Sequence, residues 1–408
     1  MKVYLDYAAT SPVKKEVLEA MMPYLVSGFG NPSSIHEWGR IARGAVDEAR
    51  ESVANFLGTS ASEIIFTSGG TEADNLAIKG LVLPFIYQDK SKPHIITSQF
   101  EHHAVLNTCK QLEKNGAEVT YLKPNRDGLI NIESVEKAIK SNTVLVSIMY
   151  VNNEIGTVQP IREIGKMIER VNGGKRSADS GQRVYFHTDA VQASQYQNVN
   201  VDHLHVDLLT ISGHKIGSPK GIGALYVRKG TPLMSMMHGG EQEFRLRAGT
   251  ENVAGIVATG KAVEVLRKEN FEIRGKRISE LRDYFIENVL KEIPETELNG
   301  SKEFRNPNNA NFYFKYIEGE SILLNLDLVG IAASSGSACT SLSLQPSHVL
   351  MSVYDSPERA HGSIRFTLGE VTTKEEIDYT VEKLREIVKK LREMSPLTPS
   401  AGQAPERK

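Results

Sequence analysis

The sequence predicts an α/β fold with a mainly parallel central sheet flanked by helices, and a smaller α+β domain toward the C-terminal end. The first observation is that short apolar runs alternate with helical patterns through roughly the first 260 residues. The second is that longer, highly charged helical patterns replace them after about Gly260. The third is the length of 408 residues, which exceeds what one hydrophobic core usually spans.

Each expected strand is a run of apolar and β-branched residues that ends at polar or glycine positions. The expected helices repeat apolar residues at helical spacing, and Gly116 marks the end of one of them. In chain order the strands are 63–68, 94–98, 118–122, 143–151, 183–190, 207–212 and 222–227, and the helices between them are 42–57, 72–82, 103–116, 132–139 and 162–171.

The chain is expected to divide into four parts. Residues 1–15 form an N-terminal segment that packs with the smaller domain, and residues 16–260 form the larger domain. Residues 261–395 form the smaller domain, which contains long charged helices, two strands and a final amphipathic helix. Residues 396–408 are rich in proline, serine and alanine, a composition typical of a disordered tail.

Composition argues against several classes of function. The 48 basic and 50 acidic residues leave a formal net charge of −2, so no broad positive field favours nucleic acid or an anionic membrane. No apolar run approaches the ~20 residues that cross a bilayer, and the N-terminal stretch lacks a signal-peptide pattern. Two cysteines are too few for a disulfide framework, which favours a cytoplasmic protein.

Ligands of open α/β sheets bind at the carboxyl ends of the strands, so the residues that follow each strand form one candidate pocket. Gly70 and Thr71 open a helix directly after a strand, and the free N–H groups there suit a phosphate. The alternative is that Thr71 only caps the helix, with Asp74 in a capping-box position. Asp189 ends a buried strand, where it either caps the next helix or pairs with a cationic group.

Lys215 lies in the turn "ISGHKIGSPKG", directly after the strand at 207–212. A lysine in a turn is usually a solvated surface residue. A partly desolvated lysine at the edge of a sheet, in contrast, can form a Schiff base with an aldehyde. Ser212 and His214 beside it offer further hydrogen-bond donors to a phosphate.

One molecule accounts for the helix end at Gly70, the carboxylate of Asp189 and the amine of Lys215. Its phosphate binds the helix end, its protonated ring nitrogen pairs with Asp189, and its aldehyde carbon meets Lys215. That molecule is pyridoxal phosphate. His102, which follows the strand at 94–98, is placed to stack on its ring, and the alternative for His102 is a solvated loop position. No histidine has the spacing of a metal-ligand set.

The chain resembles cysteine desulfurases of the NifS/IscS type, within the class V aminotransferase group of pyridoxal-phosphate enzymes. The matching stretches run in order from Met1 to about Pro396, and together they are far more specific than any one alone. They are "YLDYAATSPV", "FGNPSSIH", "FTSGGTEADNLAIKG", "EHHAVLNTC", "VNNEIGTVQPI", "HTDAVQ", "SGHKIGSPKGIGALYV", "RAGTEN", "SSGSACTS" and "SIRFTLG". The resemblance implies a fold-type I pyridoxal-phosphate transferase that acts as a homodimer.

The resemblance also implies roles for individual residues. Lys215 resembles the Schiff-base lysine, Asp189 the partner of the ring nitrogen, and His102 the ring-stacking and acid–base histidine. Further residues are expected at the cofactor: Asn153 and Gln192 near its ring and phenolic oxygen, Thr71, Ser212 and His214 at its phosphate, and Thr250 at the phosphate of the other subunit.

Two residues in the C-terminal part of the chain are expected to meet the substrate. Arg365 resembles the clamp for the substrate carboxylate, with Asn153 nearby, and a bidentate arginine contact suits that task. Cys339 lies among small and polar residues in "SSGSACTS" and resembles the nucleophile that takes sulfur, and it is also a candidate transient ligand of an iron–sulfur cluster. Cys109 lies in the middle of a helix and is expected to be structural.

The resemblance implies a cysteine desulfurase that converts L-cysteine to L-alanine and carries the sulfur on Cys339 as a persulfide. The expected acceptor is an iron–sulfur scaffold protein, and other thio-cofactors are further destinations. The alternatives are a selenocysteine lyase or another class V aminotransferase, and, outside enzymes, a non-catalytic binding or regulatory protein on the same scaffold. Ser218 and Glu241 depart from the family pattern, and the tail after Pro396 does not resemble the family's scaffold-contacting end.

Overall fold

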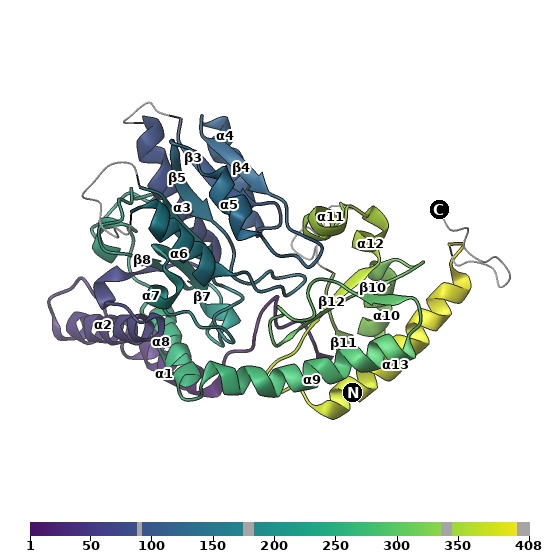
Figure 1. Ribbon diagram of the computed structural model, residues 1–408. Coiled ribbons are helices and arrows are strands. Elements are labelled where there is room, and N and C mark those ends of the chain that lie inside the picture. The colour runs from purple at the N-terminus through teal and green to yellow at the C-terminus, as the bar shows by residue number, and fades with distance from the viewer. Residues whose placement is uncertain (88–91, 174–182, 336–344, 398–408) are drawn as a thin grey trace.

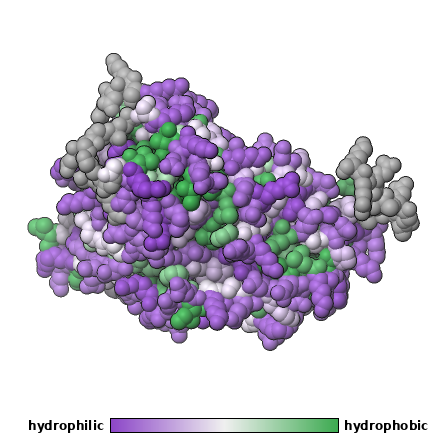
Figure 2. Space-filling view, viewed as in Figure 1, coloured by the Kyte–Doolittle hydropathy of each residue, from purple (hydrophilic) through white to green (hydrophobic). Residues whose placement is uncertain are grey.

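The computed structural model describes residues 1–87, 92–173, 183–335 and 345–397. Figure 1 shows a larger part built around one sheet and a smaller part beside it, with the long helix α9 (Phe271–Glu292) reaching from one toward the other. The face seen in Figure 2 is mostly hydrophilic, with separate hydrophobic patches. Within the described residues, no helix is long and apolar enough to cross a membrane.

The larger sheet has seven strands in the order β2-β8-β7-β6-β5-β3-β4. The strands from β3 to β7 run parallel, which confirms the mainly parallel sheet, whereas β8 runs antiparallel to both of its neighbours. The bounds are β2 Ile64–Thr67, β3 His94–Ser98, β4 Glu118–Leu122, β5 Thr143–Ser147, β6 Tyr185–Asp189, β7 Leu208–Ser212 and β8 Gly223–Val227.

Helices cover both faces of this sheet, so its central strands are buried on two sides. In β6, Phe186 faces one hydrophobic cluster and Tyr185 faces the other. The first cluster is completed by α2, α6 and α8, and the second by α3 and α4. The helices of this part are α1 Lys15–Val26, α2 Glu37–Leu57, α3 Gly70–Tyr87, α4 His103–Lys114, α5 Ile132–Ala138, α6 Ile161–Val171, α7 Val201–Leu204 and α8 Val253–Arg267.

The strand β5 and the helix α8 are two of the elements whose bounds differ from the sequence-based expectation. The strand expected over 143–151 ends at Ser147. Beyond it, the Ile148 and Tyr150 N–H groups still donate to carbonyl oxygens of β6, and the Met149 N–H donates to the carboxylate of Glu101 at 3.0 Å. The helix α8 runs across the domain boundary expected at residue 260 and packs against α1 and α2. The division into domains stays a prediction.

The smaller part contains a three-stranded antiparallel sheet in the order β12-β10-β9. In its core the ring of Phe285 meets the rings of Phe312 and Phe366 edge to face. The N-terminal strand β1 (Val3–Tyr4) pairs in parallel with β11 of this part. The remaining elements are β9 Thr296–Leu298, β10 Asn309–Phe314, α10 Gly319–Leu328, β11 Ile331–Ala332, α11 His348–Tyr354, α12 Pro357–His361, β12 Ser363–Thr367 and α13 Lys374–Met394.

Candidate active site

Two residues singled out by the sequence follow neighbouring parallel strands. β6 ends at Asp189, and β7 is followed directly by the short 3-10 helix Gly213–Lys215. Position 213 requires glycine, because a Cβ there would lie 2.9 Å from Ile222 Cγ2. The sheet and this tight turn therefore bring a carboxylate and an amine to the same edge.

The side chain of Lys215 points back to the N-terminal segment, so the interpretation as a solvated surface lysine is wrong. Its Nζ donates to the carbonyl oxygens of Ala8 and Ala9, the second at 2.7 Å. Gln192 Nε2 donates to the same Ala8 oxygen at 2.9 Å. Lys215 and Gln192 are thus brought together through backbone atoms to which the sequence assigned no role.

Asp189 is 6% exposed at the end of its strand. Burial raises the pKa of Asp189 to about 6, although the Val191 N–H at 2.9 Å and the charge of Lys215 both act in the opposite direction. Its carboxylate therefore lies where a further cationic hydrogen-bond donor would stabilise it most. This is the property expected of a partner for a protonated ring nitrogen.

A second carboxyl group, that of Asp74 on α3, is buried near Asp189. Burial raises the pKa of Asp74 well above its ordinary value, and the negative charge of Asp189 raises it further. Asp74 Oδ1 lies 3.6 Å from His187 Nε2 and has no hydrogen-bond partner among the described residues. Burial also lowers the pKa of His187 to about 3, so this histidine is neutral and cannot act as a counter-ion.

His102 caps the N-terminus of α4, where its Nδ1 accepts from the Ala104 N–H at 3.1 Å. Burial lowers the pKa of His102 to about 4, and the charge of Lys215 adds to this effect. The interpretation as a solvated loop histidine is therefore wrong. At neutral pH His102 is an uncharged ring that can accept a proton and that lies within electrostatic reach of Lys215.

The helix α3 begins at Gly70, two residues before the start expected at position 72. A Cβ on Gly70 would lie 2.9 Å from Val191 Cγ2, so the helix N-terminus lies against the residues that follow Asp189. The capping box proposed with Asp74 is wrong, because Glu72 Oε2 accepts the Ser68 N–H at 2.7 Å. Thr71 is exposed in the first turn, and its hydroxyl remains a candidate phosphate ligand.

The other two expected phosphate ligands follow β7. Ser212 is 3% exposed at the end of the strand. His214 Nδ1 lies 3.3 Å from Thr10 Oγ1, and burial, followed by the charges of Lys215 and Lys220, lowers the pKa of His214 to about 4. A neutral His214 can present one N–H donor to an anion.

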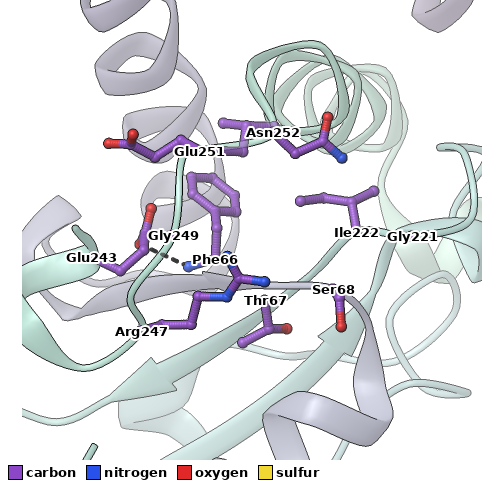
Figure 3. Close-up of a pocket in the computed structure, with 11 residues that line it drawn as sticks. Phe66, Thr67, Ser68, Gly221, Ile222, Glu243, Arg247, Gly249, Glu251 and Asn252 are labelled. Atoms are coloured by element: carbon purple, nitrogen blue, oxygen red, sulfur yellow. Dashed lines mark hydrogen bonds between the residues drawn. The ribbon is translucent and has the colours of Figure 1, made fainter. Parts of the chain in front are cut away.

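Thr250 is exposed, and the residues on both sides of it line a pocket at the end of β2 (Figure 3). This pocket includes Thr67, Ser68, Gly249 and Glu251. Glu251 is held by Arg43, whose Nη2 lies 2.5 Å from its Oε1. The expectation that Thr250 acts on another subunit stays a prediction.

Arg365 on β12 is 3% exposed, and its guanidinium faces the larger part of the chain. Its Nη1 donates to the Asn153 carbonyl oxygen at 2.9 Å, and its Nη2 donates to Asp6 Oδ1 at 2.8 Å. Its buried Nε has no hydrogen-bond partner among the described residues. The structure thus brings Arg365 to Asn153 as expected and leaves the buried Nε–H for a further acceptor, beside one remaining N–H on each terminal nitrogen.

Cys339, the expected nucleophile, lies outside the described residues. Cys109 is fully buried in α4, and burial raises the pKa of its thiol far above the ordinary value. The structural role expected for Cys109 is therefore confirmed, because a buried protonated thiol is a poor nucleophile.

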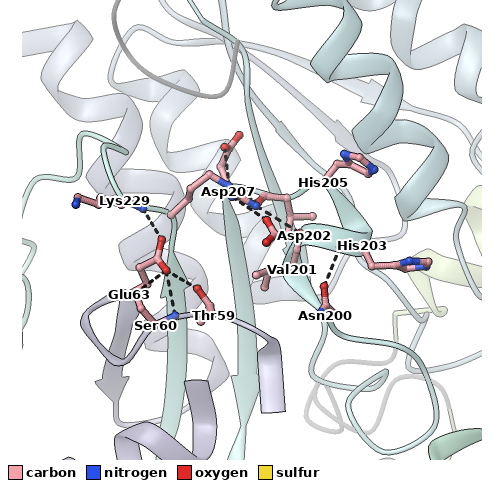
Figure 4. A network of polar contacts seen from close by, with 12 residues as sticks. Thr59, Ser60, Glu63, Asn200, Val201, Asp202, His203, His205, Asp207 and Lys229 are labelled. Carbon is pink, nitrogen blue, oxygen red and sulfur yellow. Dashed lines mark hydrogen bonds and ion pairs between the residues drawn. The ribbon is translucent and has the colours of Figure 1, made fainter. Parts of the chain in front are cut away.

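The histidines of "HLH" point to different surroundings (Figure 4). His203 is exposed, whereas His205 Nδ1 lies 2.7 Å from Glu169 Oε2. Among the described residues, no group of three or more histidine, cysteine or acidic side chains is arranged to hold a metal ion.

Sequence reasoning assigned no role to two acidic groups near this site. Glu101 is fully buried, and burial raises its pKa to about 8 although Ser98 and the Met149 N–H donate to it. Asp6 pairs with Arg365. The available signal was that Asp6 stands in the strand-like "YLDYAAT", where a carboxylate needs a partner.

Comparison with known proteins gives a consistent result. A family model described as aminotransferase class-V matches residues 3–380. A protein of Dictyoglomus turgidum named "Cysteine desulfurase IscS" is 54% identical over 395 residues, which cover 97% of this chain and 96% of that protein. A protein of Methanosarcina thermophila with the same name is 51% identical, over 97% of this chain and 94% of its own length.

Solved structures show the same fold. One named "NIFS-LIKE PROTEIN" has a TM-score of 0.87 and 35% identity, covering 96% of this chain and all of its own. Another, described as "SspA in complex with cysteine", has a TM-score of 0.78 and 38% identity, covering 91% of this chain and all of its own. These similarities extend over both parts of the chain.

Proposed function

The chain belongs to the class V aminotransferase family, and we propose that it is a pyridoxal-phosphate-dependent cysteine desulfurase. It converts L-cysteine to L-alanine and transfers the sulfur to one of its own cysteines as a persulfide. The observation that carries this proposal is the convergence of Lys215, Asp189 and His102 at one edge of the sheet, within reach of a buried arginine. Relatives named cysteine desulfurase, 54% and 51% identical over 97% of the chain, support it.

The residues present fit pyridoxal phosphate. Asp189 is a buried carboxylate that a ring N–H would stabilise, and Gly70 opens a helix without a side chain that would shield its N–H groups. Bound pyridoxal phosphate supplies an aldehyde that condenses with amines and a ring that takes up the electron pair released at the substrate Cα. The residues that would hold it are Lys215 at the aldehyde, Asp189 at the ring nitrogen, His102, Asn153 and Gln192 around the ring, and Gly70, Thr71, Ser212 and His214 at the phosphate, with Thr250 from a second copy.

Two groups of this chain are assigned to proton movement. Lys215 Nζ removes the Cα proton once the substrate amine has replaced it, and the carbonyl oxygens of Ala8 and Ala9 orient its N–H groups. His102 is neutral because burial lowers its pKa to about 4, so it acts first as a proton acceptor. Its Nδ1 is occupied by the Ala104 N–H, which directs that role to Nε2.

Arg365 is assigned to the substrate carboxylate. Its buried Nε has no partner in the part of the chain that the structure describes, and a carboxylate oxygen would satisfy it. The Cys339 thiolate then forms a bond to the substrate sulfur while the Cβ–S bond breaks. The alanine portion keeps the electron pair of that bond and takes a proton, which leaves the persulfide on Cys339.

The acceptor and the assembly belong to the same proposal. Persulfide sulfur passes to an iron–sulfur scaffold protein in the cytoplasm, as the "SSGSACTS" form implies, and Cys339 is a transient ligand of the cluster. The chain acts as a homodimer, because large apolar side chains of the N-terminal helices and their connection remain exposed. They are Leu18, Met22, Leu25, Val26, Phe29, Ile35, Trp38 and Ile41.

The test is mass spectrometry of the protein after incubation with L-cysteine. The peptide that contains Cys339 is expected to gain the mass of one sulfur atom, and Cys339→Ala is expected to stop sulfide release. Cys109→Ala is the matched control, because this second cysteine is buried and should leave the sulfur on Cys339 unchanged. Unimpaired sulfide release by Cys339→Ala would instead favour another class V chemistry. A colourless protein that takes up no cofactor would refute the proposal that the protein is an enzyme of this kind.

A further inference from the structure

The N-terminal segment, residues 5–11, lies between the smaller sheet and the turn that carries Lys215. On one side the Leu5 carbonyl oxygen accepts from the Thr367 N–H, and the Ala8 N–H donates to Thr367 Oγ1, both at 2.8 Å. On the other side the Ser11 N–H donates to the His214 carbonyl oxygen at 2.9 Å. Hydrogen bonds therefore hold this segment at both ends.

Within the segment, the carboxylate of Asp6 lies against the guanidinium of Arg365. Asp6 Oδ1 is 2.8 Å from Arg365 Nη2, and the side chains are 18% and 4% exposed. Because water screens this pair weakly, Asp6 strongly influences the orientation of the Arg365 guanidinium. The Asn153 carbonyl oxygen holds Nη1, so two acceptors determine the plane of the guanidinium.

The donors that remain on Arg365 show what this orientation achieves. A guanidinium has five N–H groups, and the contacts to Asp6 and Asn153 leave the Nε–H and one N–H on each terminal nitrogen. The Nε is buried and has no partner among the described residues, a costly arrangement unless an acceptor arrives. A ligand carboxylate can bind these remaining donors in bidentate fashion.

The same short segment also contacts Lys215, whose place at the cofactor aldehyde the substrate amine would take. The carbonyl oxygens of Ala8 and Ala9 accept from Lys215 Nζ, two and three residues after Asp6. The amine and carboxylate of an α-amino acid are attached to one carbon atom, so their protein partners need a fixed separation. One rigid stretch of backbone connects both partners here.

We propose that Asp6 is a positioning residue for the substrate: it orients the Arg365 guanidinium so that its free donors receive the carboxylate of an α-amino acid. This inference rests on the proposed role of Arg365. It predicts that loss of Asp6 weakens binding of ligands that have a carboxylate and leaves binding of simple amines unchanged.

The test compares L-alanine with ethylamine, the same molecule without its carboxylate, by the change each causes in the absorption of the bound cofactor. Asp6→Ala is expected to weaken the binding of L-alanine about tenfold, which corresponds to about 1.4 kcal/mol, and to leave the binding of ethylamine unchanged. Asp6→Asn keeps an oxygen acceptor without the charge, so a loss of about threefold is expected. With cysteine, KM rises by similar factors while kcat stays within about twofold.

The matched control is Lys14→Met, which removes the ion pair between Lys14 and Glu370 near the same segment and leaves Arg365 untouched. It should change neither the affinity for L-alanine nor that for ethylamine.

Arg365→Lys separates the positioning role of Asp6 from the carboxylate clamp proposed for Arg365. If Arg365→Lys weakens the binding of L-alanine and neither Asp6 variant does, the positioning role of Asp6 is refuted. If Arg365→Lys also leaves the binding of L-alanine unchanged, the carboxylate clamp itself is refuted. Equal losses for L-alanine and ethylamine in the Asp6 variants would mean a merely structural role and would also overturn the inference.

Discussion

Replacing Asp189 by asparagine should stabilise the cofactor-free protein while it impairs the enzyme. The carboxylate is 6% exposed, and burial raises its pKa to about 6. Asparagine has the same shape and can still accept the Val191 N–H, but it carries no charge that must be desolvated. With cofactor bound, the variant lacks the charge that we propose pairs with the ring nitrogen, and kcat should fall about 100-fold or more.

The magnitude follows from proton linkage. The folded pKa of about 6 lies above the ordinary 3.8, so between these pH values the folded protein binds a proton that the unfolded chain releases. Stability of the cofactor-free protein therefore falls as pH rises from about 4 to about 6, by about 3 kcal/mol in all. Asp189→Asn removes this loss. For 408 residues, 3 kcal/mol corresponds to about 3 °C in Tm.

The assay is thermal unfolding of cofactor-free protein at pH 4.5, 6 and 8. The Tm advantage of Asp189→Asn should be small at pH 4.5 and near its maximum at pH 8. Glu370→Gln is a useful comparison, because that carboxylate is more exposed and its side chain pairs with Lys14. A variant that is less stable than the unaltered protein at pH 8, or equally stabilised at every pH, would refute the reasoning.

Three further predictions concern separate residues. Arg50→Met should cost about 3–5 kcal/mol in urea unfolding, because it leaves Glu243 buried without its partner at 2.7 Å, and adding Glu243→Leu should recover most of that loss. His102→Phe keeps an aromatic ring without a proton acceptor, so kcat should fall about 100-fold or more at unchanged cofactor content. Lys215→Ala should lower activity at least about 1,000-fold, and borohydride should fix no cofactor to the protein. The first prediction would be contradicted by a double variant that is as unstable as Arg50→Met. The second would be contradicted by an active His102→Phe variant, and the third by a Lys215→Ala variant to which borohydride fixes the cofactor.

The order and type of the elements were predictable from the sequence, because the signals are local. Apolar runs of strand length and helical spacing depend only on near neighbours along the chain. The early end of β5 was not predictable, because the residues after Ser147 contact parts of the chain far away in sequence, such as Glu101, which accepts the Met149 N–H. The antiparallel direction of β8 likewise depends on how its neighbours associate.

At the candidate site, the residue types were predictable and their surroundings were not. The sequence pointed to Lys215, Asp189 and His102, but treated exposure as a real alternative for Lys215 and His102. Burial excludes that alternative for His102, and the contacts to Ala8 and Ala9 exclude it for Lys215. Capping by Thr71 and Asp74 is wrong, because α3 begins at Gly70, two residues before the expected start, and the Asp74 side chain is buried.

By itself, then, the sequence determined which chemical groups follow which strand, since a short stretch of chain contains that information. Only the tertiary structure decided that Asp6, Asn153 and Arg365 meet, although they are separated by as many as 359 positions. The physical reason is that orientation, desolvation and charge depend on distances in space, which arise when separate parts of the chain pack together.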